Sequence, residues 1–307
     1  MNPRPHAAAS RSAASDWLIL VLANAIWGST DVVAKAAVEE LSPSALAWLR
    51  LTIALAAFAP ALWRRRAEIP RTLAGLLPFL ALGASGFFLN FVLHYSGLTL
   101  APASHATALR VSEASVIFLL SALLLRERIR PAAVLGLLAG TAGVFLILNL
   151  DFANLALFAG GYRFGDLLIL GGILIEGCYT IIGKRVLRTT RPFTATALAG
   201  LCGWLLLTLF YAPKLAGEFV RQPPSLNALL AAAFLGLLAT GFGYWMWYRV
   251  LARRDSHQVG VTILVQPVVG IPLAALIFHD PLPLRFLLGT GLIAIGGYLA
   301  IRSPVHE

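Results

Sequence analysis

Five polar side chains of this 307-residue chain lie within stretches that are otherwise apolar: Asp31, Arg110, Glu113, Glu176 and Gln266. Ionisable groups in such stretches are costly and usually face a cavity or a charged partner. A buried carboxylate suits an ammonium group or a transferable proton, and the fork of an arginine suits a carboxylate. These residues could therefore bind a small charged solute, or they could form ion pairs that hold helices together.

The stretches that carry these residues have the composition of membrane helices. The chain is 59% hydrophobic and 12% charged, whereas about 25% of the residues in a soluble domain are charged. Segments 72–109, 131–150, 222–248 and 256–279 contain no Asp, Glu, Lys or Arg, and about 20 such residues cross a bilayer core. We therefore predict an all-α polytopic membrane protein.

Apolar runs bounded by basic residues and prolines predict ten transmembrane helices. Prolines fall near several of their starts, where the missing N–H costs no hydrogen bond. The predicted helices are 17–37, 43–63, 73–97, 102–125, 131–149, 165–187, 193–212, 226–250, 257–278 and 284–301.

The second half of the chain repeats the first. Segment 104–128 aligns with 256–280, and both begin with Ser-His and carry polar groups near the middle. Flanking residues recur at two constant offsets. At 149 residues, Gly28, Lys35 and Pro43 recur as Gly177, Lys184 and Pro192. At 153 residues, Gly136 and Gly143 recur as Gly289 and Gly296. Five helices per repeat is an odd number, so the second repeat must enter the membrane from the opposite side. Inverted repeats of this kind are a transporter architecture, with the substrate site between them.

The predicted organisation has two repeats with short connections. Residues 1–15 are expected to form a disordered cytoplasmic tail, 16–149 the first repeat, 150–164 an extracytoplasmic loop, 165–302 the second repeat and 303–307 a cytoplasmic tail. With both termini in the cytoplasm, 17 Lys and Arg residues fall inside and 5 outside, while Arg50 and Arg110 lie within the membrane. This bias satisfies the positive-inside rule and predicts an integral protein of a bacterial cytoplasmic (inner) membrane.

With these features the chain resembles the drug/metabolite transporter superfamily, EamA type. The resemblance rests on the paired five-helix repeats, on Trp27-Gly28 in the first helix, and on the acids Glu127 and Asp280 that close each fourth helix. It implies a basket of ten helices in which helices 1, 3, 4, 6, 8 and 9 line a cavity and helices 5 and 10 are peripheral. Within the family the chain looks most like the aromatic amino-acid exporters. Two departures, Glu176 in place of a second tryptophan and Asp280 in place of a glutamate, imply that the repeats are not equivalent.

Depth along the helices selects the candidate site. At about 1.5 Å per residue, four side chains from different helices fall near the membrane midplane: Trp27, Glu113, Glu176 and Gln266. Polar and aromatic residues at helical spacing complete the set. The predicted cavity residues are Trp27, Asp31, Phe87, Asn90, Phe91, His94, Arg110, Glu113, Glu176, Tyr179, Tyr244, Trp245 and Gln266.

Alternative roles remain open for several of these residues. Asp31 falls at the depth of Arg110 and Arg50, which predicts a structural ion pair, although Arg110 could instead bind a substrate carboxylate. Asn90 and His94 could bond between helices. Trp247 and Tyr248 are assigned to the aromatic belt at the membrane interface.

The preferred function is a secondary transporter that exports small solutes, with aromatic or hydrophobic amino acids as the expected class. Uptake or exchange of another metabolite or drug-like compound is the alternative, and a membrane-embedded transferase is a weaker one. The expected partners are a small-molecule substrate, the lipid bilayer and, as a candidate coupling ion, protons. The sequence shows no catalytic constellation, metal motif, cofactor motif or nucleic-acid motif.

Overall fold

The structure is a computed structural model that describes residues 5–110, 112–125, 131–148, 162–280 and 282–301. Every regular element in this part of the chain is a helix of α, 3₁₀ or π type. Most of the predicted loop 150–164 and the whole C-terminal tail 303–307 lie outside the described residues. The expected all-helical fold is confirmed.

The two halves contain similar series of helices, each with a π-helical segment in the third span, and they differ in where a 3₁₀ turn occurs. In the first half these are α1 (Pro5–Val38), α2 (Pro43–Arg64), a 3₁₀ turn (Arg66–Glu68), α3 (Leu73–Leu82), a π-helical segment (Gly83–Leu89), α4 (Asn90–Leu100), α5 (Ala103–Arg110), α6 (Ser112–Leu124) and α7 (Pro131–Leu148). In the second half they are α8 (Tyr162–Val186), α9 (Pro192–Arg221), α10 (Leu226–Ala233), a π-helical segment (Phe234–Tyr244), α11 (Trp245–Leu251), α12 (Ser256–Gly260), a 3₁₀ turn (Val261–Leu264), α13 (Val265–Phe278) and α14 (Leu284–Ile301).

Eight helical stretches of the described residues are long and apolar enough to cross a membrane. Several are composite: Leu73–Leu100 joins α3 to α4, and Leu226–Leu251 joins α10 to α11. The remaining two predicted positions hold α7 and α14, which have 18 residues each. The chain is an integral membrane protein, and its predicted count of ten spans depends on these two helices.

Some boundaries differ from those expected. Helix α1 begins at Pro5, so residues 5–15 are helical where a disordered tail was predicted, because the Ala-rich segment favours helix and proline fits the first turn. Helix α8 begins at Tyr162, within the predicted loop. Helix α9 runs to Arg221, well past the predicted end at residue 212, and it accommodates Pro213.

Repeated lysine contacts show that the halves share one architecture. Lys35 donates to the carbonyls of Leu98 and Ala101, at the end of α4. In the second half Lys184 donates to the carbonyls of Leu251 and Arg254, at the end of α11. The donors are separated by the offset of 149 and the acceptors by the offset of 153. Each lysine therefore satisfies helix-terminal carbonyls of its own repeat.

The two halves also cap each other's helices at one end of the bundle. Ser42 is the N-cap of α2, and its backbone N–H and hydroxyl donate to Glu218 of α9. Ser225 is the N-cap of α10, and its N–H and hydroxyl donate to Glu40. The hydrogen bonds from the Ser225 hydroxyl and N–H lower the pKa of Glu40. Both acids thus bind a helix start in the opposite repeat.

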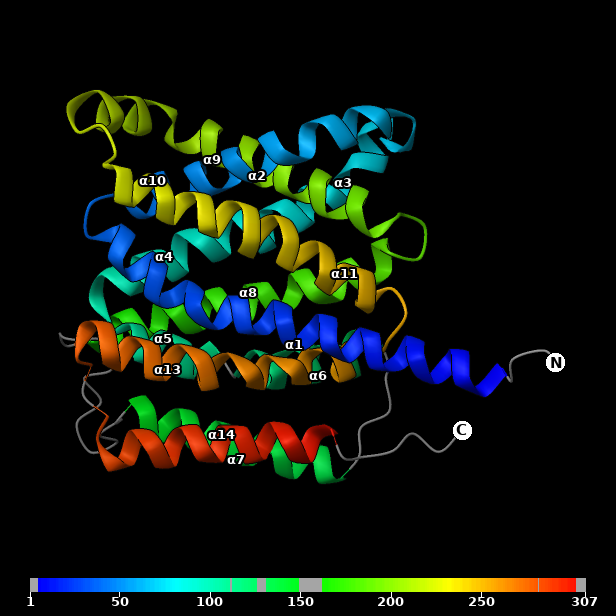
Figure 1. Ribbon diagram of the computed structural model, residues 1–307, viewed down its shortest axis with the longest axis vertical. Coiled ribbons are helices and arrows are strands. Elements are labelled where there is room, and N and C mark those ends of the chain that lie inside the picture. Colours follow the sequence, from blue (N-terminus) through cyan, green and yellow to red (C-terminus); the bar gives the residue numbers. More distant parts are fainter. Residues whose placement is uncertain (1–4, 111, 126–130, 149–161, 281, 302–307) are drawn as a thin grey trace.

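Helices α7 and α14 form a pair at one end of the assembly, as Figure 1 shows. A Cβ atom added to Gly143 would lie 2.4 Å from the carbonyl oxygen of Gly289, and one added to Gly296 would lie 2.4 Å from that of Gly136. As the residue number rises along one helix it falls along the other, so the pair is antiparallel. Inverted repeats require this arrangement of their matching fifth helices.

Replacing Gly296 by alanine should destabilise the protein, because the new methyl group would overlap the backbone of α7. The expected loss is about 1–3 kcal/mol, seen as a lower melting temperature in detergent. Gly291→Ala on the same helix is the matched control, since nothing lies within 4 Å of a Cβ added there. Equal melting temperatures for the two variants would contradict this packing.

Candidate functional site

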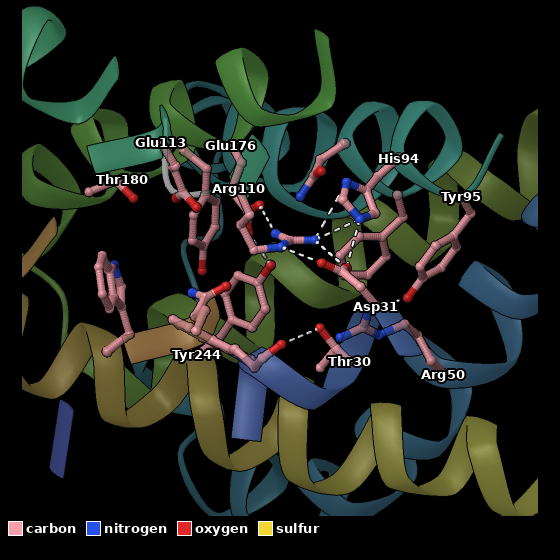
Figure 2. A pocket seen from close by; sticks show the side chains of 16 residues that line it. Thr30, Asp31, Arg50, His94, Tyr95, Arg110, Glu113, Glu176, Thr180 and Tyr244 are labelled. Atoms are coloured by element: carbon pink, nitrogen blue, oxygen red, sulfur yellow. Dashed lines mark hydrogen bonds and ion pairs between the residues drawn. The ribbon is translucent and has the colours of Figure 1, made fainter. Parts of the chain in front are cut away.

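Side chains from both halves line a small cavity, which Figure 2 shows from close by. Its walls come from α1, α2, α4, α5, α6 and α8, from the π-helical segment that ends at Tyr244, and from α11 and α13. The remaining volume is about 30 Å³, which is room for a water or two.

Arg110 is the centre of a buried ion cluster. Its Nη2 lies 3.1 Å from Oδ1 of Asp31, and its Nη1 lies 3.0 Å from Oε2 of Glu176. Asp31 and Glu176 belong to different repeats and both are buried. A single guanidinium thus forms an ion pair with one acid from each half of the protein.

Other polar groups hold the two acids in place. His94 Nε2 lies 2.8 Å from Oδ1 of Asp31, and the Thr107 hydroxyl donates to Oδ2 at 3.3 Å. On the other side, the Tyr244 hydroxyl donates to Glu176 at 2.5 Å. The cluster is well supplied with hydrogen bonds, as a buried ion pair requires.

Glu113 differs from the other two acids. It lines the same cavity and is only 5% exposed. It lies three residues after Arg110, so both point from the same side of the fourth span. Within the described residues its carboxyl group has no hydrogen bond or ion pair, and it is the acid most available to a ligand or a proton.

Aromatic rings form the apolar part of the wall. Trp27 packs against Tyr244 and Trp247, with ring centroids 5.2 and 5.4 Å apart. Its indole N–H donates to the carbonyl of Ala239 at 2.8 Å. Tyr179 lies 5.5 Å from the Tyr244 ring. These edge-on and tilted contacts are the preferred geometry of aromatic pairs and create a surface suited to another ring.

Several wall residues retain an unused polar atom. Asn90 Oδ1, Gln266 Oε1 and the Tyr179 hydroxyl are buried and have no hydrogen-bond partner among the described residues, although their side chains line the cavity. Buried polar atoms without partners are rare, and each calls for an explanation. Two of these are acceptors only, so a ligand that donates hydrogen bonds would match the wall.

Most of the candidate residues lie together. Eleven of them line the cavity: Trp27, Asp31, Asn90, Phe91, His94, Arg110, Glu113, Glu176, Tyr179, Tyr244 and Gln266. Phe87 stands behind the wall, 4.9 Å from the Tyr244 ring and fully buried. Trp245 does not line the cavity; its ring packs edge-on against Phe193, 6.3 Å away. The predicted place of Trp245 in a substrate site stays a prediction.

Five further residues line the cavity that the sequence pattern does not predict there: Thr30, Arg50, Tyr95, Thr180 and Trp247. Trp247 and Tyr248 were assigned to an interfacial belt, yet they are 2% and 0% exposed. Tyr248 stacks on Tyr179 at 4.9 Å. The sequence does contain a signal for Arg50, because an arginine within a membrane span usually faces a cavity or a charged partner.

This fold and site define a polytopic membrane protein of the transporter class. A family model described as the EamA-like transporter family matches residues 16–149 and 163–302. The chain belongs to that family.

Relatives match along most of the chain. An uncharacterised transporter of Archaeoglobus fulgidus is 29% identical, covering 94% of this chain and 99% of its own. A probable amino-acid metabolite efflux pump of Escherichia coli is 25% identical, covering 93% and 94%. An aromatic amino acid exporter of Ancylobacter novellus is 28% identical, covering 61% and 63%. A solved crystal structure superposes with a TM-score of 0.68 at 25% identity, covering 94% of this chain and 96% of its own.

Arg110→Gln should be strongly destabilising, because it leaves Asp31 and Glu176 buried without their cation. Removal of one partner of a buried pair costs about 3–5 kcal/mol. The control is Arg191→Gln, which removes a mostly exposed pair with Glu68 worth about 0–1 kcal/mol. Melting temperatures of the purified proteins provide the comparison. An Arg110 variant as stable as the control would show that the cluster does not hold the helices together.

Proposed function

We propose that this protein is a secondary transporter that exports amino acids with aromatic or apolar side chains across a bacterial cytoplasmic membrane. Both termini lie in the cytoplasm in this proposal. The observation that carries it is the cavity between the repeats, where charged groups and aromatic rings meet inside an otherwise apolar bundle. The names of the efflux pump and exporter relatives support the same substrate class.

The wall chemistry supports a substrate with one apolar end and one zwitterionic end. An aromatic or aliphatic side chain would gain free energy by leaving water for the rings of Trp27, Tyr179 and Tyr244. Apolar contacts make weak geometric demands, so the selectivity among such side chains is broad. A second charge on the substrate side chain would have no assured partner and would oppose entry.

The small cavity supports an alternating-access mechanism in which this conformation is occluded. Pockets for small molecules usually measure about 300–1,000 Å³, whereas this cavity measures about 30 Å³. An amino acid can therefore enter only after the walls move apart. Inverted repeats permit this motion, because each half can exchange conformation with the other.

Contacts between the repeats at both ends of the bundle are candidate gates. At one end Glu40 binds Ser225 and Glu218 binds Ser42. At the other end, Asp16 pairs with Arg253 and Arg254 at 2.7 and 3.3 Å. Glu68 pairs with Arg191 at 3.2 Å at that same end. In this proposal each set opens while the other stays closed.

Glu113 is the group we propose for proton coupling. Glu176 accepts hydrogen bonds from Arg110 and Tyr244, so its carboxylate is already paired in the structure. Glu113 has no such partner among the described residues, and it could exchange a proton whenever the cavity opens to water. Uptake or exchange of a different metabolite is the alternative, and it would use the same cavity.

Reconstituted protein should transport phenylalanine, tryptophan, methionine and leucine, and it should reject lysine and glutamate. If Glu113 carries the proton, Glu113→Gln should lose its response to a pH gradient while retaining transport down a phenylalanine gradient. Radiolabelled amino acids in proteoliposomes, with and without that gradient, make the measurement.

Glu176→Gln is the comparison for this experiment. It should lower the melting temperature more than Glu113→Gln, because it removes a partner of the ion cluster. A preference for lysine or glutamate over phenylalanine would reject the proposed substrate class. An unchanged response of Glu113→Gln to the pH gradient would remove Glu113 from the coupling.

A further inference from the structure

Arg50 is a buried arginine whose guanidinium makes no direct ion pair with a described carboxylate. It lies in α2, lines the cavity and is 5% exposed. In the part of the chain that the structure describes, it forms no ion pair with Asp or Glu. Its bonded partners are neutral: Nε donates to the Thr240 hydroxyl at 2.8 Å, and Nη1 donates to the Tyr95 hydroxyl.

The neutral partners fix the position of the Arg50 guanidinium through Nε and Nη1 and leave Nη2 without a hydrogen bond to a described residue. Its Cζ lies 4.1 Å from the centroid of the Phe91 ring, a stacked position that supports an arginine side chain. No described residue accepts a hydrogen bond from Nη2 of Arg50. A buried charge with free donors is costly unless an anion completes it.

Arg110 is the other arginine of this cavity, and its guanidinium already binds two carboxylates. Asp31 and Glu176 accept hydrogen bonds from its guanidinium at 3.1 and 3.0 Å. A substrate carboxylate would have to displace one of these acids to bind Arg110. It would displace nothing charged at Arg50.

We propose that Arg50 binds the carboxylate of the transported solute and that Tyr95, Thr240 and Phe91 position its guanidinium. This inference rests on the proposed function and assigns one end of the substrate. Figure 2 shows Arg50 and Glu113 on opposite sides of Arg110. The carboxylate site is therefore separate from the acid proposed to carry a proton.

The test compares ligands that differ only in their charged groups. Phenylalanine, phenethylamine, which lacks the carboxylate, and 3-phenylpropionate, which lacks the ammonium, are titrated into the purified full-length protein by calorimetry. The parent should bind phenylalanine at least about tenfold more tightly than phenethylamine, because a charge-assisted hydrogen bond has that value. In Arg50→Gln this ratio should fall to about one, with phenethylamine affinity retained.

A purely structural role for Arg50 predicts a different result. Both affinities would then fall together and the ratio would persist, which would overturn the assignment while leaving the proposed function intact. Arg185→Gln, which removes a cation outside the cavity, should keep the parent ratio. If Arg50→Gln does not fold, Arg50→Met decides, because it also removes the charge: a reduced ratio supports carboxylate binding, and an unchanged ratio contradicts it.

Two further outcomes separate the remaining explanations. A parent protein that binds none of the three ligands would reject the proposed substrate class and this assignment together, whereas equal binding of all three would reject the assignment alone. Exchange of chloride for gluconate tests an inorganic counter-ion. A melting temperature that falls in the parent but not in Arg50→Gln would assign the site to chloride and overturn the proposal.

Discussion

An arginine buried in a membrane protein needs compensating partners, and in this chain Arg110 pairs with Asp31 from the first repeat and with Glu176 from the second. The desolvation of three charges is costly, so the cluster persists only because its geometry and its extra hydrogen bonds are good. That requirement fixes α1, the fourth span and α8 around one point. The aromatic wall and the ion cluster line the same cavity.

The repeats share their backbone design but not their charges. Lysine contacts and glycine contacts recur at the offsets of 149 and 153, and each third span carries a π-helical segment beside the cavity. Yet segments 192–213 and 256–279, which match the helices of Arg50 and Arg110, contain no Lys or Arg. Duplication therefore supplies two halves of similar backbone design, while the first half supplies both arginines of the cavity.

The sequence was sufficient to predict the helical class, the inverted repeats and most of the wall, because apolar length, recurrence and charges within apolar runs are all visible in the order of residues. It could not settle helix rotation. Trp245 and Trp247 are two residues apart, and the π-helical segment before them changes the angle at which each faces the interior. Arg50 was noticed as intramembrane, but its lack of an acid became visible only once Asp31 was seen to pair with Arg110.

The central claim is that the cavity around Arg110 opens to both sides of the membrane and binds the solute. Thr180 lines this cavity and is 1% exposed, so a cysteine at that position reports its opening. With Cys178 and Cys202 replaced by alanine, Thr180→Cys should react with a membrane-impermeant thiol reagent applied to either face, and phenylalanine should slow the reaction. Reaction from one face only, or reaction that phenylalanine leaves unchanged, would contradict the account.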